Sequence, residues 1–290
     1  MTQNVSKAVL ITGCSTGIGR ATAEHLAARG WNVYATARRP ESISDLEAAG
    51  CSTLALDVTD EASMAAAVKA VEDAEGAVGV LVNNAGYSQS GAVEEVPLDT
   101  VRRQFETNVF GLARMCQLVL PGMRRQGWGK IVNISSIGGK LVFPGGGYYH
   151  ATKHAVEAIS DALRFEVKNF GVDVAVIEPG LIRTSFDDAA VASMEGTSSD
   201  DSPYADFNAA VAKTTQEAYV KGPASKLGGG PETVAHAIEK AISSRRPRIR
   251  YKVTPSARVT LATRALLPDR GWDAFVGSQF PRPGGKAKSG

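Results

Sequence analysis

Short apolar runs alternate along the chain with longer segments in which apolar residues recur every three or four positions. Six runs are predicted strands, at residues 8–12, 32–37, 53–58, 79–84, 130–135 and 173–178, and residues 247–253 are predicted to form a last one. Most of these runs are continuously apolar, as expected of strands that are buried on both faces of a sheet. Strands separated by helices predict an α/β fold: a doubly wound parallel sheet in a three-layer α/β/α sandwich.

Proline, glycine and helical spacing mark the predicted helices. Pro97 opens a helix over 99–124, and Gly171 ends one over 148–170. We interpret two apolar stripes on these helices as core packing: Val101, Phe105, Val109, Leu112 and Cys116, and Ala151, Ala155, Ile159, Ala162 and Phe165.

The pattern loosens after residue 184. We expect residues 185–230 to form a substrate-loop insertion with a helix over 203–220, and residues 281–290 to be a frayed tail. No linker or internal repeat divides the chain, so residues 1–290 are predicted to form a single catalytic domain.

Composition and charge exclude several classes of protein. Hydrophobic residues make up 43% of the 290, enough for a full core, and the formal net charge of +2 argues against a nucleic-acid partner. The basic stretch 243–252 is interpreted as a solvated strand edge or a surface for a carboxylate-rich partner. The three cysteines are far apart, which disfavours a zinc site or a disulfide framework and favours a cytoplasmic location. No apolar run approaches the ~20 residues that cross a bilayer, so no transmembrane segment is expected.

A glycine-rich turn follows the first predicted strand. Gly13, Gly17 and Gly19 lie in "TGCSTGIG" (12–19), between that strand and a helix. Glycines allow a tight turn and close approach to a pyrophosphate, which would meet the N–H groups at the start of the helix. Glycines also occur in ordinary turns, but the strand-turn-helix context favours a dinucleotide site in a Rossmann-type fold.

The end of the second strand distinguishes between dinucleotides. Ala37 is followed by Arg38 and Arg39, where a carboxylate would bind the ribose 2′-OH of NAD. A guanidinium pairs with a 2′-phosphate, which a carboxylate would repel, and Ser15 offers a further donor. We therefore predict NADP(H); the alternative is that the arginines are simply exposed at a strand end.

The stretch "GGGYYHATKHA" (145–155) contains the candidate acid/base. Lys153 lies four residues after Tyr149 and shares its helix face. An ammonium beside a phenol lowers the phenol pKa toward the working pH, as a proton carrier at a carbonyl or alcohol requires. Tyr149 is therefore the predicted acid/base, whereas Tyr148 is expected to pack or to line the pocket.

A second donor for the developing alkoxide is expected at the carboxyl end of the fifth strand, where ligands bind in such sheets. Ser135 and Ser136 both lie there, and the pattern leaves the choice open. His150 and His154 flank the tyrosine-lysine pair, but a serine hydrolase is disfavoured because the chain has no G-x-S-x-G elbow.

Seven motifs resemble those of the short-chain dehydrogenases/reductases in order and spacing. They are "TGCSTGIG", "LDV" (56–58), "NNAG" (83–86), "TNVFG" (107–111), "NISS" (133–136), "YHATK" (149–153) and "PGLIRT" (179–184). The resemblance implies a catalytic tetrad. Ser136, thirteen residues before Tyr149, would polarise the substrate oxygen while Tyr149 exchanges the proton. Lys153 would hold the nicotinamide ribose and lower the tyrosine pKa, and Asn108 would keep a water in a relay to Lys153.

The glycine turn and the resemblance together predict the cofactor contacts. They are Gly13, Ser15, Thr16, Gly17, Ile18, Gly19, Arg38, Asp57, Val58, Asn84, Ala85, Gly86, Tyr149, Lys153, Pro179, Gly180, Ile182 and Thr184. The resemblance implies no metal.

The branch of the family that contains the 17β-hydroxysteroid and retinol dehydrogenases is similar in "VYATARR", "TNVFG" and "LLPDRGWD". This likeness implies an alcohol/carbonyl oxidoreductase for a bulky apolar, steroid-, retinoid- or aryl ketone-like substrate, assembled as a homodimer or homotetramer through the long helices. The predicted pocket lining is Leu141, Val142, Phe143 and Tyr148, although a loop packed on the core would have the same pattern. One alternative is a 3-oxoacyl thioester reductase, which usually has a shorter chain. The other is a non-catalytic NADP(H)-sensing protein, which has no need of the tetrad.

Overall fold

The computed structural model describes residues 5–184, 193, 201–220 and 226–283. The predicted substrate-loop insertion is therefore described only at residues 193, 201–220 and 226–230, and the predicted tail only at 281–283. The other residues of the predicted insertion and of the predicted tail lie outside the described part of the chain.

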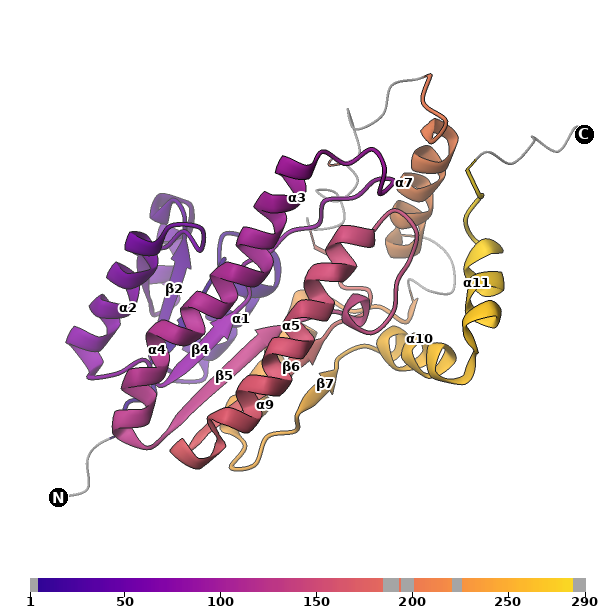
Figure 1. Cartoon of the computed structure of the whole chain (residues 1–290). Coiled ribbons are helices and arrows are strands. Elements are labelled where there is room, and N and C mark those ends of the chain that lie inside the picture. The colour runs from indigo at the N-terminus through magenta and orange to yellow at the C-terminus, as the bar shows by residue number, and fades with distance from the viewer. Residues whose placement is uncertain (1–4, 185–192, 194–200, 221–225, 284–290) are drawn as a thin grey trace, which may run out of the picture.

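Seven parallel strands form one sheet in the order β3-β2-β1-β4-β5-β6-β7, which confirms the predicted doubly wound α/β fold (Figure 1). The strands are β1 (Val9–Ile11), β2 (Val33–Ala37), β3 (Cys51–Ala55), β4 (Val80–Asn83), β5 (Gly129–Ile134), β6 (Val172–Glu178) and β7 (Arg250–Lys252). The strand order reverses between β1 and β4: strands β1 to β3 follow one another toward one edge of the sheet, and β4 to β7 toward the other. Ligands of such sheets bind beside the carboxyl ends of the strands at this switch point.

Strand β3 departs from its prediction at 53–58. It pairs with β2 from Val33↔Cys51 to Ala37↔Ala55, so it starts and ends earlier than expected. It is also an edge strand, and within it only Cys51 is fully buried. Continuous burial was therefore a wrong expectation for this strand, because in the described residues it has a neighbouring strand on one side only.

Helices cover both faces of the sheet. On one face α1 (Gly17–Ala28) and α9 (Pro231–Ser243) pack together over one apolar cluster. On the other, α2 (Glu61–Glu75), α4 (Leu112–Gln126) and α5 (Gly147–Glu166) enclose a second cluster. The remaining helical elements are η1 (Pro40–Glu47), α3 (Leu98–Phe105), η2 (Glu106–Gly111), η3 (Ile137–Gly139), η4 (Lys168–Phe170), α7 (Ala205–Val220), α10 (Pro255–Leu266) and α11 (Asp269–Gly277).

The helix predicted over 99–124 is present, but its middle turn is π-helical instead of α-helical. Elements α3, η2 and α4 follow one another without a break, and η2 is a turn of π-helix. Such turns are rare and occur frequently at functional sites. Hydrophobic periodicity does not reveal them, because one extra residue barely disturbs the pattern.

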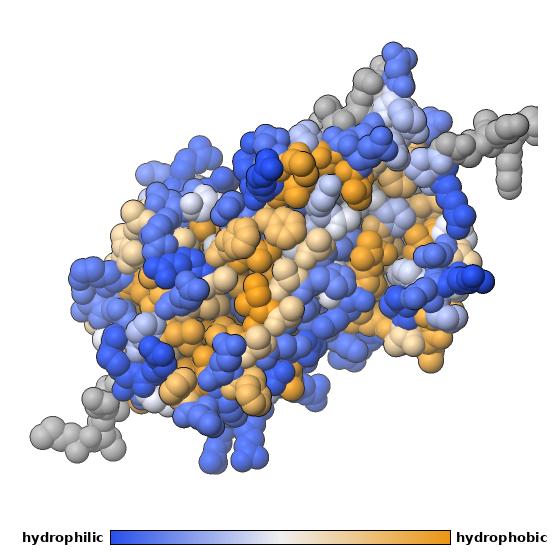
Figure 2. Space-filling view, viewed as in Figure 1, coloured by the Kyte–Doolittle hydropathy of each residue, from blue (hydrophilic) through white to orange (hydrophobic). Residues whose placement is uncertain are grey.

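The apolar stripe predicted to bury α5 in the core faces outward instead. Ala151 and Ala162 are exposed, and Phe165 is 84% exposed. The buried face of α5 carries Thr152, Lys153, Val156, Glu157 and Ser160, most of which are polar and have partners inside the protein. Figure 2 shows apolar side chains gathered on the face that α4 and α5 present.

Two C-terminal helices were not predicted. Helices α10 and α11 bury Leu261, Trp272 and Val276 against Leu141, which follows η3. They thereby brace the chain between β5 and α5. In the described residues, no helix is both long and apolar enough to cross a membrane.

Candidate active site

The glycine turn between β1 and α1 requires its glycines. Gly13 and Gly17 have φ of 74° and 59°. A Cβ on Gly19 would lie 2.3 Å from the carbonyl oxygen of Gly13, so only glycine fits there. No side chain caps α1 at Thr16, and the first turn of α1 contains no acidic residue. These features fit the phosphates of a dinucleotide, because in the part of the chain that the structure describes no N-cap side chain occupies the start of the helix.

Thr12 and Asn84 hold this turn in place. The Thr12 hydroxyl accepts hydrogen bonds from the backbone N–H groups of Asn84 and Ala85, both at 3.0 Å. The Asn84 side-chain amide donates to the carbonyl oxygens of Thr12 and Gly13, both at 2.9 Å. Sequence analysis missed Thr12, whose only signal was its place at the end of the strand. The amide of Asn84, predicted to contact the cofactor, is thus engaged by the turn itself.

The other predicted cofactor residues follow the carboxyl ends of the strands. Arg38 follows β2 and is exposed; Asp57 and Val58 follow β3; Ala85 and Gly86 follow β4; Pro179, Gly180, Ile182 and Thr184 follow β6. Thr184 lies beside the glycine turn, because a Cβ added to Gly17 would be 3.5 Å from the Cβ of Thr184. Ser15 and Thr16 are exposed, whereas Ile18 packs partly against the core. The structure therefore brings these residues to one edge of the sheet.

Asn108 lies in the π-helical turn η2 and is buried. Its amide nitrogen donates to the carbonyl oxygen of Tyr87 at 2.8 Å and to the hydroxyl of Thr152 on α5 at 3.1 Å. Its amide oxygen accepts from the N–H of Tyr87 at 3.1 Å. Asn108 therefore ties the chain after β4 to α5.

Lys153 lies beneath Tyr149 on the buried face of α5. Its ammonium donates to the carbonyl oxygen of Ile134 at 2.9 Å and lies 5.8 Å from the centre of the Tyr149 ring. A Cβ on Gly86 would lie 3.1 Å from Oδ1 of Asn108 and 3.8 Å from Nζ of Lys153. Lys153 and Asn108 thus meet at Gly86, next to the predicted nicotinamide site.

The two serines after β5 occupy different environments. Ser135 is buried, and within the described part of the chain its hydroxyl has no hydrogen-bond partner. Ser136 accepts from the N–H of Gly138 at 3.1 Å and forms a hydrogen bond with Tyr149. The tertiary structure thus places Ser136, and not Ser135, beside the phenol.

The pKa values of Tyr149 and Lys153 depend first on burial. Burial raises the pKa of Tyr149 to about 12, and its hydrogen bond with Ser136 acts in the opposite direction. Burial lowers the pKa of Lys153 to about 8, against the attraction of Glu157. The net shift of the Tyr149 pKa is therefore upward, opposite to the lowering expected from Lys153. Desolvation of the phenol dominates, while the ammonium donates to Ile134.

His150, which flanks the tyrosine-lysine pair, is buried. Its ring lies 6.3 Å from that of Phe143 and 5.6 Å from that of Tyr149, measured between centroids. Burial lowers its pKa to about 4, so the imidazole is neutral near pH 7. Cys14, in the glycine turn, is also fully buried, and burial raises the pKa of its thiol to about 12.

The four predicted pocket residues have different surroundings. Leu141 and Phe143 pack against the cluster that contains Trp272, and Val142 is exposed. The Tyr148 hydroxyl donates to the carbonyl oxygen of Val93 at 3.1 Å. Most of the predicted lining is therefore engaged with neighbouring protein segments.

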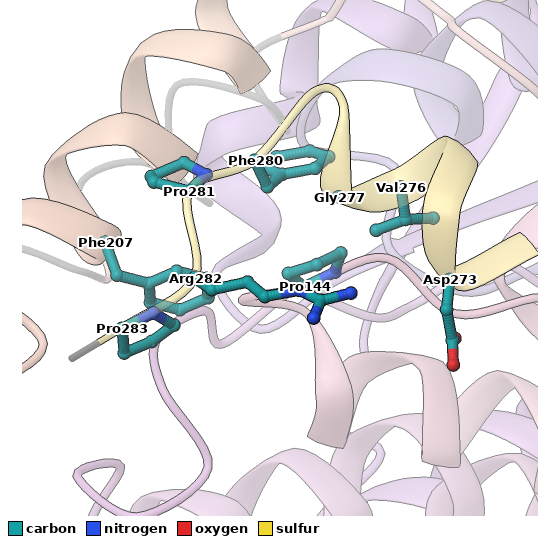
Figure 3. Close-up of a pocket in the computed structure, with 9 residues that line it drawn as sticks. All are labelled: Pro144, Phe207, Asp273, Val276, Gly277, Phe280, Pro281, Arg282 and Pro283. Atoms are coloured by element: carbon teal, nitrogen blue, oxygen red, sulfur yellow. The ribbon is translucent and has the colours of Figure 1, made fainter. Parts of the chain in front are cut away.

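A cavity of about 350 Å³ lies between α7 and the C-terminal segment (Figure 3). Its lining is mostly apolar: Pro144, Phe207, Val276, Gly277, Phe280, Pro281 and Pro283, with the charged residues Asp273 and Arg282. No tetrad residue lines it, but Pro144 belongs to the loop that leads to Tyr149.

Comparison with known proteins gives consistent results. The family model described as "short chain dehydrogenase" matches residues 7–195. The chain is 38% identical over 264 residues to a 3-ketodihydrosphingosine reductase of Bacteroides thetaiotaomicron, covering 90% of this chain and 93% of that one. It is 36% identical over 270 residues to an NADPH-dependent 3-dehydrocapnine reductase of Ornithobacterium rhinotracheale, covering 90% and 93%.

A solved structure has the same fold. A short-chain dehydrogenase from Streptomyces avermitilis superposes with a TM-score of 0.77 at 35% identity, covering 96% of this chain and 97% of that one. The family model, the relatives and the parallel sheet agree with the sequence motifs, and the chain belongs to the short chain dehydrogenase family of oxidoreductases.

Proposed function

We propose that this protein is an NADP(H)-dependent reductase that interconverts an alcohol and its ketone or aldehyde on a bulky apolar substrate. The observation that carries the proposal is the position of Tyr149, hydrogen-bonded to Ser136 and one helical turn from Lys153. All three groups lie at the carboxyl end of β5, near the turn that fits a dinucleotide. NADPH, when bound, supplies the hydride.

Each tetrad residue has a distinct task in this proposal. The phenol of Tyr149 donates the proton to the carbonyl oxygen, and the Ser136 hydroxyl stabilises the developing negative charge on that oxygen. The ammonium of Lys153 stabilises the phenolate that remains on Tyr149. Asn108 holds the chain after β4 against α5 through Tyr87 and Thr152, so that Gly86 lies next to Lys153.

The preference for NADP(H) over NAD(H) is part of the proposal. Arg38 is exposed directly after β2, and no carboxylate occupies that position. A guanidinium there suits the 2′-phosphate. The similarity to a relative named NADPH-dependent supports the same choice.

The substrate class is proposed from two observations. The names of two relatives specify a keto or dehydro group at position 3, which favours a ketone of this kind on a lipid. The mostly apolar cavity beside Pro144 suits the apolar part of such a molecule. A 3-oxoacyl thioester also carries a 3-keto group and is the second candidate, whereas steroids and aryl ketones test the branch resemblance.

The direct test is NADPH consumption on a panel of 3-keto lipids, 3-oxoacyl thioesters, steroids and aryl ketones. Tyr149→Phe is expected to lower kcat by about 10² to 10⁴-fold, the usual contribution of a positioned acid. Tyr148→Phe is the matched control, because it removes only a hydrogen bond to Val93. Binding of NADPH without turnover of any substrate would favour a sensor. Equal or better use of NADH, or no effect of Arg38→Asp, would refute the cofactor preference.

Assembly and environment are proposed on separate grounds. Exposed aromatic residues, Phe110 on η2 and Phe165 on α5, support a homodimer or homotetramer formed through the long helices. All three cysteines are free thiols, which supports a reducing cytoplasm. One sheet with apolar clusters on both faces supports a single catalytic domain.

A further inference from the structure

A buried ion network begins one helical turn beyond Lys153. The Glu157 carboxylate, on α5, lies 2.9 Å from Nζ of Lys140 and 3.0 Å from Nε of Arg250 on β7. Glu157 itself is 3% exposed, so its carboxylate lies out of water, whereas Lys140 and Arg250 are partly exposed. Arg250 therefore connects the edge strand β7 to the helix that carries Tyr149.

Arg250 also contacts two other carboxylates. Its guanidinium lies 2.6 Å from Asp161, one turn further along α5, and 3.3 Å from Glu178 at the end of β6. Glu178 is almost fully buried, and burial followed by repulsion from Glu157 raises its pKa. Buried carboxylates so close together are costly unless cations are held between them.

The network joins three segments that form the candidate site. Lys140 follows η3, which begins directly after Ser136, and Glu178 directly precedes Pro179. The packing leaves no spare room, because a Cβ on Gly139 would lie 2.9 Å from Cγ of Glu157. Movement of Glu157 would therefore disturb the turn that holds Ser136.

Ion pairs of this kind are weak evidence for stability, because removing charges from water offsets most of their attraction. Their effect on a neighbouring charge is less ambiguous. Lys153 is buried, which disfavours its ammonium, and Glu157 is the charged group that acts against this burial.

We propose that Glu157 is a positioning residue of the ketone reduction, which places a negative charge one helical turn from Lys153 and, through Lys140 and Arg250, holds the Ser136 turn against α5. This inference rests on the proposed function and assigns a role to a residue outside the tetrad. Glu157 acts through Lys153 and the turn and does not contact the substrate.

The sign of the expected effect follows from the surrounding charges. The groups that face Glu157 and Lys153 are Tyr149 and Asp161 on α5, Lys140 after η3, the Ile134 carbonyl of β5, Asn108 on η2, Glu178 on β6 and Arg250 on β7. Glu157→Gln removes a negative charge, so the Tyr149–Lys153 pair loses its proton at lower pH. Lys140→Met removes a positive charge, so the pair loses its proton at higher pH.

Reduction needs this proton, and the alkaline limb of the kcat profile is therefore the first readout. It should move down by about 0.5 to 1 pH unit in Glu157→Gln and up by a smaller amount in Lys140→Met. Asp161→Asn is the matched control, because Asp161 binds the same Arg250 but is partly exposed and does not act on Lys153. The alkaline limb of the kcat profile of Asp161→Asn should stay at the wild-type pH.

The second readout does not require turnover. ¹³C NMR of the lysine Cε atoms follows the titration of Lys153, whose signal is identified by its loss in Lys153→Met. Its midpoint should fall in Glu157→Gln, rise in Lys140→Met and stay unchanged in Asp161→Asn. NADPH fluorescence should give dissociation constants within about threefold of wild type in these three variants, less than 1 kcal/mol.

Unchanged limbs and midpoints in Glu157→Gln, or shifts of the same direction in Glu157→Gln and Lys140→Met, would overturn the proposal in favour of a merely structural role. If Glu157→Gln does not fold, Lys140→Met tests the proposal, because Lys140 is partly exposed and its replacement is expected to be tolerated. The midpoint of the Lys153 titration must then rise in Lys140→Met. Failure of the proposed function would be distinct: wild type would consume no NADPH with any ketone, while the NMR titration would still measure the influence of Glu157.

Discussion

Thr12 is the residue on which the glycine turn most depends, and Thr12→Val tests this directly. Valine has nearly the same shape as threonine and leaves no cavity. It removes the one hydroxyl that accepts from the N–H groups of Asn84 and Ala85. Thr12 is 1% exposed, so water cannot readily replace the lost acceptor.

The magnitude follows from the two donors left without an acceptor. Each unsatisfied buried N–H costs about 1–3 kcal/mol, so Thr12→Val should lower the free energy of unfolding by about 2–6 kcal/mol. Thr12→Ser keeps the hydroxyl and loses only a methyl group, which should cost about 1 kcal/mol. The loosened turn in Thr12→Val should also weaken NADPH binding by about tenfold, or 1.4 kcal/mol.

Urea unfolding of wild type, Thr12→Val and Thr12→Ser without ligand measures the first effect, and NADPH fluorescence titration measures the second. Equal destabilisation of the two variants would refute the reasoning, since the hydroxyl would then contribute nothing beyond its packing. A large loss of stability with unchanged NADPH affinity would show that the turn does not depend on Thr12.

Three further predictions concern the surface, the buried lysine and the thiols. Phe165→Glu should shift the oligomer toward smaller species in sedimentation velocity, because Phe165 is 84% exposed on α5; a monomeric wild type would contradict this. Burial lowers the pKa of Lys153 from 10.5 to about 8. Burying the protonated lysine therefore destabilises the folded protein fully below pH 8, and this destabilisation disappears as the pH rises to 10.5. Wild type should therefore gain about 2–3 kcal/mol relative to Lys153→Met over that range in urea unfolding, and a constant difference would be contrary evidence. Cys14, Cys51 and Cys116 are buried, so a thiol reagent should label native protein slowly and urea-unfolded protein at once; rapid labelling of Cys14 would disprove its burial.

Much of the fold was predictable because the spacing of apolar residues differs between helices and strands. Runs such as 130–135 and 173–178 match β5 and β6 closely, since both strands are almost fully buried and mostly apolar. The prediction was less accurate at the edge strand β3, where burial is partial. It omitted α10 and α11, which pack mainly against the loop around Leu141 and not against the sheet.

The candidate site divides in a similar way. Spacing alone placed Lys153 on the face of Tyr149, because residues four apart always meet on a helix. It could not choose between Ser135 and Ser136, because only the folded structure shows which of the two hydroxyls lies beside Tyr149. It also misjudged the Tyr149 pKa, because burial is a property of the surrounding structure and not of the neighbouring lysine.

The sequence by itself determined the order of the elements, the glycine turn and the tyrosine-lysine pair, because each depends on residues close together in the chain. Only the tertiary structure decided what is far apart in sequence. It turned the apolar stripe of α5 outward and its polar face inward, and it brought Glu157 between Lys140 and Arg250. The physical reason is that a buried charge is tolerated only where partners from other segments reach it, and their distances are set by packing.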